Sequence, residues 1–593
     1  MLRIFALIAA FAWASQLNAA QSVVRQVSNV AFEADNPWDL PYFQAPAIYD
    51  NELYFSASTD DKETRLFATD GRRVRSFNVS PGHSVGSQSI EFQGQLYFRG
   101  DDGHGIEPFT TDGHTLTNLD LSQTPEGSWP YNFNVVGDSL YFQGGLFDAA
   151  GNVQAYMFHT DGNEVTTLAN TSTSDSYPWG SAAGGKFYFP ANGPDGFELY
   201  RAEGRAIQQV IDVNPGLNGS SPWPAGELNG EFYFTAVGPE GRGLYRTEGE
   251  GAIQLPFPPD PSQSGGPVNF VRFGEALYFQ GKGEDGYELY RTDGDSVTHL
   301  DLLPGPESSG AATYAGAESG GKLMVPGRGP NGWAIFIVNS DGELANRIDL
   351  GQIPYPVTPG MPHLEALVQD QKRGFYDSWP RELREFQGEV YFEGTGPTGP
   401  DLYKTDGQTL TKFNLVPESG SLNRGVGLYG AQSLAGSLYF IATTEMGVEL
   451  VRTDGSTTSI IDLASGGESS YPRQLELIGE ELVFQTHFAE STVIYATDGT
   501  SMRRLAEFPD MAIDTGYGYV ENVNSTTDFL RLGDALFFLG RTEQGWRLHR
   551  IGAIPEPSGL MLVIVPTLLA SVLRRPFRAR RHERMPPAAA PPR

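Results

Sequence analysis

One five-residue segment matches a catalytic pattern by its letters. Gly82-His83-Ser84-Val85-Gly86 has the form G-x-S-x-G, in which α/β-hydrolases expose a nucleophilic serine on a sharp turn between a strand and a helix. Here the segment lies in a Pro-Gly-Ser loop that recurs along the chain, with strand-like residues on both sides and no helical pattern after it. We therefore expect Ser84 to be structural, and the sequence predicts no catalytic residue.

Acidic and imidazole side chains are metal ligands, but their spacing here matches no common metal motif. Loops such as Asp101-Asp102-Gly103 lack the alternating twelve-residue pattern of an EF-hand. The nine histidines form no H-E-x-x-H pair, and the chain contains no cysteine, which excludes thiolate sites for zinc. Because Asp-Gly is first of all a turn former, we expect solvated turns and no cofactor, with calcium binding as the alternative.

Three tryptophans next to prolines are candidates for stacking on sugar rings. Trp129, Trp179 and Trp223 each adjoin a proline in the loops between successive repeats. A large aromatic face that is held rigidly can pack against the apolar face of a pyranose, so one interpretation is a glycan platform. The other is that these rings close the gap between neighbouring structural units.

All these residues belong to a unit that recurs eleven times. An aromatic triplet such as Leu277-Tyr278-Phe279 is followed about fifteen residues later by a Thr-Asp-Gly turn such as Thr292-Asp293-Gly294. The middle residues of the triplets are Tyr54, Tyr97, Tyr141, Tyr188, Tyr233, Tyr278, Met324, Tyr391, Tyr439, Val483 and Phe537. A period of about 45 residues that contains four short strands predicts an all-β fold of four-stranded, β-propeller-like blades.

The Asp-Gly dipeptide, which eight of the eleven units contain, also predicts a particular turn. Two strand-like segments flank Asp293-Gly294, which is a common sequence for a two-residue type I′ hairpin. This turn requires positive φ at both of its central residues.

The unit resembles the bacterial ELWxxDGT repeat. The closest matches lie at Phe197–Gly204, Glu288–Gly294, Asp401–Gly407 and Val448–Gly455. The tryptophan of the family is mostly tyrosine here, and the final threonine is kept only at Thr500. The resemblance covers nearly all of residues 23–550, and it implies an exported, propeller-like repeat protein without implying a defined reaction.

The repeats fall into two groups around an irregular segment. Units 1–7 occupy residues 23–345 and units 8–11 occupy residues 386–552, with an insertion at residues 346–385 that could contain a short helix at Leu364–Lys372. Because propellers typically have four to eight blades, we expect two rings joined near residue 350. One large ring and an open array are the alternatives. The array begins in mid-blade, because residues 23–50 have the pattern of outer strands of the first unit.

The first twenty residues predict export. Arg3 precedes an apolar run from Ile4 to Ala14, and small residues follow at Ala19 and Ala20. This order is typical of a secretory signal peptide over residues 1–20, cleaved after Ala20.

The C-terminal segment, residues 554–582, resembles a PEP-CTERM sorting signal. It contains Pro555-Glu556-Pro557, a short apolar span at residues 559–573, and a basic cluster that begins with Arg574 and Arg575; residues 583–593 form an additional tail. The resemblance implies transient anchoring in the inner membrane and cleavage by an exosortase-type enzyme. The arginines place the repeats outside the membrane under the positive-inside rule.

Composition limits the classes of partner. The formal net charge of −31 disfavours nucleic acid and other polyanions. We therefore expect an exported structural or binding scaffold of the cell surface or extracellular matrix, whose partners are extracellular polysaccharide or other surface proteins. The alternatives are a propeller-type glycan-binding protein or carbohydrate-active enzyme, and a calcium-dependent adhesion module.

Overall fold

The computed structural model describes residues 22–33, 44–59, 64–80, 89–122, 124–147, 151–171, 180–216, 219–258, 266–283, 286–350, 380–396, 399–415, 425–464, 467–488, 491–514, 520–523 and 526–553. The predicted signal peptide, the Ser84 loop, the candidate helix at Leu364–Lys372 and the C-terminal sorting signal lie outside these residues.

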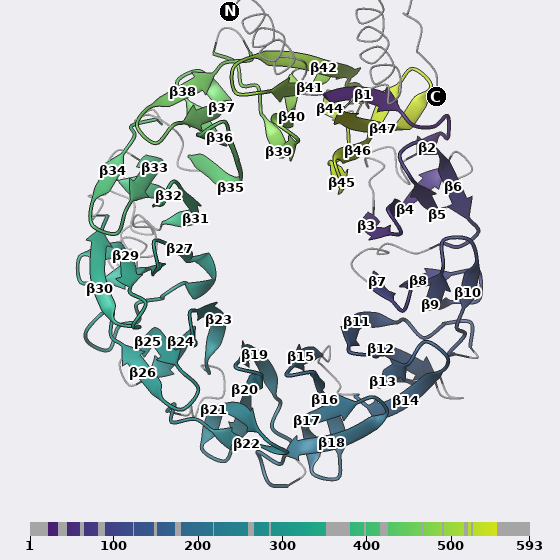
Figure 1. The fold of residues 1–593 in the computed structure, drawn as a ribbon, viewed down its shortest axis with the longest axis vertical. Helices are drawn as coiled ribbons and strands as arrows, with labels where there is room; N and C mark the ends of the chain where they lie inside the picture. Colours follow the sequence, from purple (N-terminus) through teal and green to yellow (C-terminus); the bar gives the residue numbers. More distant parts are fainter. Residues whose placement is uncertain are drawn as a thin grey trace, which may run out of the picture. The chain divides into compact units, whose positions relative to one another are not determined.

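Residues Val23–Gly552 form one unit in which eleven four-stranded antiparallel sheets are the blades of a single ring (Figure 1). The predicted all-β propeller fold is therefore confirmed. In the ring, the first strand of each blade lies on the inner side and the fourth on the outer side. Within the described ranges the only helical element is one 3-10 turn, η2 (Thr313–Ala315). The same ranges contain no helix that is long and apolar enough to cross a membrane.

The strands of blades 1 to 4, from the inner to the outer strand, are β3 (Gln44–Tyr49), β4 (Glu52–Thr59), β5 (Thr64–Thr69) and β6 (Val74–Phe77); β7 (Ser89–Phe92), β8 (Gln95–Asp101), β9 (Ile106–Thr111) and β10 (Leu116–Asn118); β11 (Tyr131–Val136), β12 (Ser139–Phe147), β13 (Val153–Thr160) and β14 (Val165–Asn170); and β15 (Ser181–Ala183), β16 (Lys186–Gly193), β17 (Gly196–Glu203) and β18 (Ala206–Ile211).

The strands of blades 5 to 8 are β19 (Trp223–Leu228), β20 (Glu231–Gly238), β21 (Gly241–Glu248) and β22 (Gly251–Gln254); β23 (Val268–Phe273), β24 (Ala276–Gly283), β25 (Gly286–Thr292) and β26 (Val297–Leu300); β27 (Ala317–Ser319), β28 (Lys322–Gly329), β29 (Gly332–Val338) and β30 (Leu344–Asp349); and β31 (Arg381–Phe386), β32 (Glu389–Gly396), β33 (Gly399–Thr405) and β34 (Leu410–Lys412).

The strands of blades 9 to 11 are β35 (Val426–Leu434), β36 (Ser437–Thr444), β37 (Gly447–Thr453) and β38 (Thr458–Ile461); β39 (Arg473–Ile478), β40 (Glu481–Phe488), β41 (Ser491–Thr497) and β42 (Met502–Pro509); and β45 (Leu530–Leu532), β46 (Ala535–Thr542), β47 (Gly545–Ala553) and β1 (Ser22–Gln26). A separate two-stranded hairpin, β43 (Met511–Asp514) and β44 (Val520–Val523), precedes the last blade.

The two ends of the repeat array close the ring together. β1 pairs with β47 and so supplies the outer strand of blade 11, and the backbone N–H of Val27 donates a hydrogen bond of 2.8 Å to the carbonyl of Leu548. The short strand β2 (Phe32–Glu33) pairs with both β4 and β47, which joins blades 1 and 11 in one sheet. The expectation that residues 23–50 are outer strands of the first unit is wrong, because β1 is the outer strand of blade 11 and β3 is the inner strand of blade 1. The array does begin in mid-blade, and β1 completes the last blade and so closes the ring.

The expectation of two rings is wrong, because blades 7 and 8 pack directly on each other. Asn346 Nδ2 donates a hydrogen bond of 2.8 Å to the carbonyl of Gly407, and Ile337 shares a buried cluster with Val390 and Phe392. The described ends of the segment 346–385 belong to β30 and β31. The irregular segment therefore lengthens a connection without separating the blades on either side.

The aromatic triplets form the core between neighbouring blades. The Tyr188 ring of blade 4 stacks on the Phe232 ring of blade 5 with centroids 4.7 Å apart, and Tyr141 of blade 3 stacks on Phe187 of blade 4 at 4.5 Å. All four side chains are buried. Stacking of this kind adds to the free energy gained by burying the rings, so these rings stabilise the contacts between neighbouring blades.

The prediction of a type I′ turn at Asp293-Gly294 is wrong. Thr292 pairs with Val297, which leaves four residues in the connection, and Asp293 is not among the described residues with positive φ. Asp293 Oδ1 instead accepts hydrogen bonds from the backbone N–H groups of Asp295 (3.1 Å) and Ser296 (2.9 Å). This local side-chain bond sets the turn in place of the backbone hairpin geometry.

Type I′ geometry occurs at a different place in the repeat. Asn229 and Gly230 have φ of 55° and 82° and connect β19 to β20 as a two-residue turn between Leu228 and Glu231. The two-residue turn therefore connects the first and second strands of the blade, whereas the prediction placed it between the third and fourth.

Candidate functional site

Most sequence-predicted site residues lie outside the described residues. These are Trp179, the sorting motif Pro555, Glu556 and Pro557, and the basic residues Arg574 and Arg575. Trp129 and Trp223 are described and can be placed.

Trp129 and Trp223 are both exposed but occupy different positions of the repeat. Trp129 lies before β11 with φ of 49° and donates a hydrogen bond of 2.7 Å from Nε1 to the carbonyl of Glu126. Its counterpart in blade 5 is Ser221, which has φ of 47° and also precedes a proline. Trp223 comes two residues later, as the first residue of β19. Blade 4 lies between the two tryptophans, which are therefore not gathered into one site (Figure 1).

The glutamate of the repeat motif holds the connection from one blade to the next. Glu288 is fully buried on β25 and accepts backbone hydrogen bonds from Leu302 (3.1 Å) and Ser309 (2.9 Å). Glu107, Glu198 and Glu449 bind the corresponding loops in blades 2, 4 and 9. Burial raises the pKa of Glu288 to about 7, against the opposing effect of these hydrogen bonds.

The cation three residues after this acidic position, which is Glu198, Asp401 or Glu449 in the three cases below, binds the next blade. Arg201, Lys404 and Arg452 donate hydrogen bonds of 3.1, 2.7 and 2.8 Å to the carbonyls of Gly249, Gly455 and Gly499. Each of these glycines belongs to the turn of the following blade. The charged residues of the repeat motif thus serve to connect blades.

The acidic loop at Asp101-Asp102-Gly103, one of the calcium candidates of the sequence, is a locally satisfied turn. Asp101 Oδ1 accepts hydrogen bonds from the backbone N–H groups of Gly103 (2.7 Å) and Gly105 (3.2 Å). No group of three or more potential metal ligands occurs within the described ranges.

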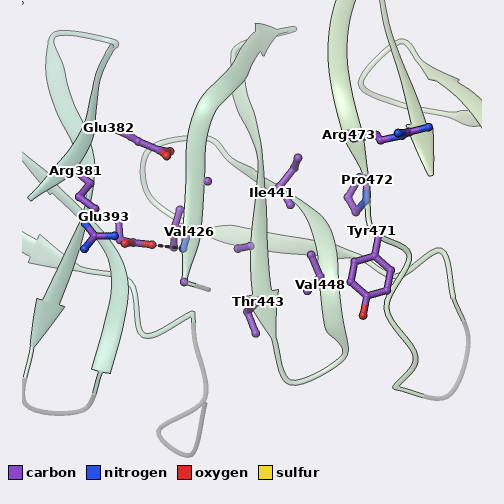
Figure 2. A pocket seen from close by; sticks show the side chains of 13 residues that line it. Arg381, Glu382, Glu393, Val426, Ile441, Thr443, Val448, Tyr471, Pro472 and Arg473 are labelled. Atoms are coloured by element: carbon purple, nitrogen blue, oxygen red, sulfur yellow. Dashed lines mark hydrogen bonds between the residues drawn. The ribbon is translucent and has the colours of Figure 1, made fainter. Parts of the chain in front are cut away.

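A pocket with a volume of about 460 Å³ lies among blades 8, 9 and 10 (Figure 2). Its charged lining consists of Arg381, Glu382 and Glu393 from blade 8 and Arg473 from blade 10. Tyr471 stands at the blade 10 side, and the remaining lining includes the apolar residues Val426, Ile441, Val448 and Pro472.

Backbone hydrogen bonds hold the two glutamates of the pocket. Glu393 Oε2 accepts a bond of 2.7 Å from the N–H of Val426, and Glu382 Oε2 accepts bonds from the N–H groups of Leu428 and Tyr429. Burial raises the pKa of the Glu393 carboxyl, and the nearby Arg381 acts in the opposite direction. Both carboxylates thus connect blade 8 to β35 of blade 9.

Sequence reasoning missed this pocket, although an alignment of the repeats contains a signal for it. The residue after each aromatic triplet is, in chain order, Ser56, Arg99, Gln143, Pro190, Thr235, Gln280, Pro326, Glu393, Ile441, Gln485 and Leu539. Glu393 is the only carboxylate at this position of the eleven repeats.

Comparisons with known proteins give no family. No family model matches the sequence, and no curated protein matches it. A puromycin-hydrolysing peptidase of Mycobacterium tuberculosis is 14% identical with a TM-score of 0.26, over 62% of this chain and 61% of that one. The TolB protein of Acinetobacter baumannii is 14% identical with a TM-score of 0.21, over 50% of this chain and 75% of that one.

An acylaminoacyl peptidase of Pyrococcus horikoshii is 12% identical with a TM-score of 0.24, and the match covers 60% of this chain and 58% of that one. The chain therefore spans about three fifths of the length of the two peptidases. At these scores the likeness carries no conclusion about activity.

Proposed function

We propose that this protein is an exported scaffold of the cell surface or extracellular matrix, in which the eleven-bladed ring is a frame that binds other surface material. The observation that carries the proposal is the use of the repeated polar residues. Glu288 binds the loop that leads to blade 7, and Arg452 binds the turn of blade 10. Because charged residues of the repeat connect one blade to the next, the sequence is suited to building a large, rigid frame.

The export part of the proposal rests on the two ends of the sequence. Residues 1–20 have the order of a signal peptide, and residues 554–582 have the order of a PEP-CTERM signal. Exosortase-type processing would follow transient anchoring in the inner membrane. Polysaccharide or other surface proteins are then the partners within reach, and the net charge of −31 disfavours nucleic acid.

Localisation in the native host tests the proposal. We expect the full chain, with an epitope tag in the exposed Gly137-Asp138 turn between β11 and β12, to be labelled by antibody on intact cells. Deletion of residues 2–20 should keep the protein inside the cell, and truncation after residue 553 should release it from the surface. Recovery of the untruncated protein from the cytoplasm, or identical distribution of all three forms, would contradict the proposal.

A further inference from the structure

We propose that the pocket among blades 8, 9 and 10 is a binding site for a neutral saccharide. The inference deepens the proposed function, because it rests on a scaffold that holds polysaccharide, but it concerns a defined site that can be tested on the purified chain. Four observations support it: a local departure from the repeat, a unique carboxylate, a balanced charge, and an aromatic ring at the edge.

The pocket lies beside a strand that departs from the repeat. Because all blades share one repeat, the same strand can be compared from blade to blade. In blade 6, β23 advances three residues from Val268 to Val271 while β24 advances two, which is a single-residue bulge. In blade 9, β35 advances five residues from Gly427 to Gln432 while β36 advances two. Departures from a regular pattern that stability alone would favour are expected at functional sites.

The enlarged bulge carries an exposed aromatic residue whose backbone contacts the lining of the pocket. Tyr429 lies within it and is 91% exposed, and its backbone N–H donates a hydrogen bond of 2.8 Å to Glu382, which lines the pocket. A tyrosine has an apolar ring that can pack on a ligand and a hydroxyl that can stay in water. The bulge is thus held against the pocket by one of the lining carboxylates.

A second departure from the repeat pairs a carboxylate with a guanidinium on neighbouring strands. Glu393 pairs in register with Arg381 across β31 and β32, and Figure 2 shows both side chains at the same side of the pocket. In blade 6 the corresponding pair is Val268 and Gln280, which carries no charge. Such a pair offers hydrogen-bond acceptors and donors side by side, which suits neighbouring hydroxyl groups.

The charge and shape of the lining select the ligand class. The lining contains two arginines and two glutamates, so the pocket has no net formal charge and favours a neutral ligand over an ion. Tyr471 has φ of 43° and is 45% exposed, so part of its ring is accessible for packing against the C–H face of a sugar. The volume of about 460 Å³ lies within the usual range of small-ligand sites.

The test measures binding of neutral oligosaccharides to the purified full chain. The probes are glucan, mannan and galactan oligosaccharides of two to six units, compared with an alginate oligosaccharide and with one acidic and one basic peptide. Saturation-transfer NMR and calorimetry detect binding. We expect at least one neutral series to bind and the anionic saccharide not to bind.

Two substitutions connect binding to the pocket. Glu393→Gln keeps the size of the side chain and removes its charge, and Tyr471→Asn removes the ring while tolerating positive φ. We expect each to weaken binding at least tenfold without changing the melting temperature by more than a few degrees. Ser221→Asn, at the position in blade 5 that corresponds to Tyr471, is the matched control and should leave binding unchanged.

The outcomes separate this inference from the proposed function. Failure of every neutral saccharide to bind, binding only of peptides, or binding that both pocket variants retain would overturn the inference. None of these results affects surface localisation. Conversely, a cytoplasmic protein that binds saccharide through Glu393 and Tyr471 would retain the pocket and overturn the scaffold proposal.

Discussion

Arg452 in blade 9 donates a hydrogen bond of 2.8 Å from Nη1 to the carbonyl oxygen of Gly499 in blade 10. Gly499 is the glycine of the Thr-Asp-Gly turn, and its N–H is bound by Thr497 Oγ1 of the same turn. The cation of one repeat therefore recognises the turn of the next. The spacing of the motif residues therefore serves contacts between two blades as well as contacts within one blade.

Arg452→Met should weaken the contact between blades 9 and 10. The substitution keeps the apolar stem and removes a charge-assisted hydrogen bond, which contributes about 1.5–3 kcal/mol in typical cases. Because a ring of this size need not unfold in one step, the measurement is hydrogen exchange of the amides in the 498–501 turn, which should accelerate. Arg504→Met, at an exposed position of β42, is the control, and equal acceleration in both variants would contradict the assignment.

Gly294→Ala should destabilise blade 6 through two effects that can be separated. Gly294 has φ of 109°, and a Cβ there would come within 2.7 Å of the Tyr233 hydroxyl of blade 5. Gly305 has φ of 115° with nothing within 4 Å of a Cβ, so Gly305→Ala measures the backbone cost alone. We expect Gly294→Ala to cost at least about 1 kcal/mol more than Gly305→Ala.

A second substitution isolates the contact with the tyrosine. Tyr233→Phe removes the hydroxyl, so it should recover part of the loss caused by Gly294→Ala when the melting temperatures of the single and double variants are compared. No recovery in the double variant would mean that the turn does not pack on Tyr233 as described.

The stability contributed by two buried glutamates should fall as the pH rises from about 5 to 8. Burial raises the pKa values of Glu198 and Glu288 to about 7, from the ordinary 4.5. The carboxyl groups of Glu198 and Glu288 therefore bind their protons more tightly in the folded chain than in the unfolded chain. The stabilisation from their protonated forms is complete below pH 4.5 and is lost as the pH passes 7. Each group contributes at most about 3 kcal/mol to this change.

Glu288→Gln tests that pH dependence because glutamine does not titrate. The slope of melting temperature against pH between 5 and 8 should become less negative than in the wild type, and the other buried glutamates should preserve part of the effect. Glu275→Gln, on the exposed turn before β24, is the control. An unchanged slope in Glu288→Gln would show that this carboxyl does not titrate in the range.

The sequence predicted the blade and its phase because both depend on local patterns. Tyr278 and its counterparts recur at a fixed spacing, and four strands per unit follow from the turns between them. The number of rings could not be read in this way. Each interface buries similar rings, such as Tyr188 on Phe232, so no residue of the repeat marks where a ring must close.

The pocket was missed for a related reason. Its residues come from three blades, and Glu393 and Arg473 are 80 positions apart in the chain. Only the register of β31 on β32 brings Arg381 opposite Glu393. The tryptophans stand out in the sequence because each adjoins a proline. The positive φ at Trp129 and Ser221 shows, however, that Trp129 corresponds to Ser221 and not to Trp223.

Blade 2 offers a substitution that should strengthen the ring. Thr110 pairs with Tyr97 in blade 2, just as Arg291 pairs with Tyr278 in blade 6. Thr110 therefore occupies the position of the arginine. A pocket of about 480 Å³, lined by Tyr97, Gly162 and other residues of blades 2 and 3, lies at this interface. Thr110→Arg should place a guanidinium near the carbonyl of Gly162, slow hydrogen exchange in the 161–164 turn and raise the melting temperature. Thr110→Met fills space without a donor. If it protects the turn as well as arginine does, the gain comes from packing and not from a hydrogen bond like those that blades 4, 8 and 9 make to the next blade.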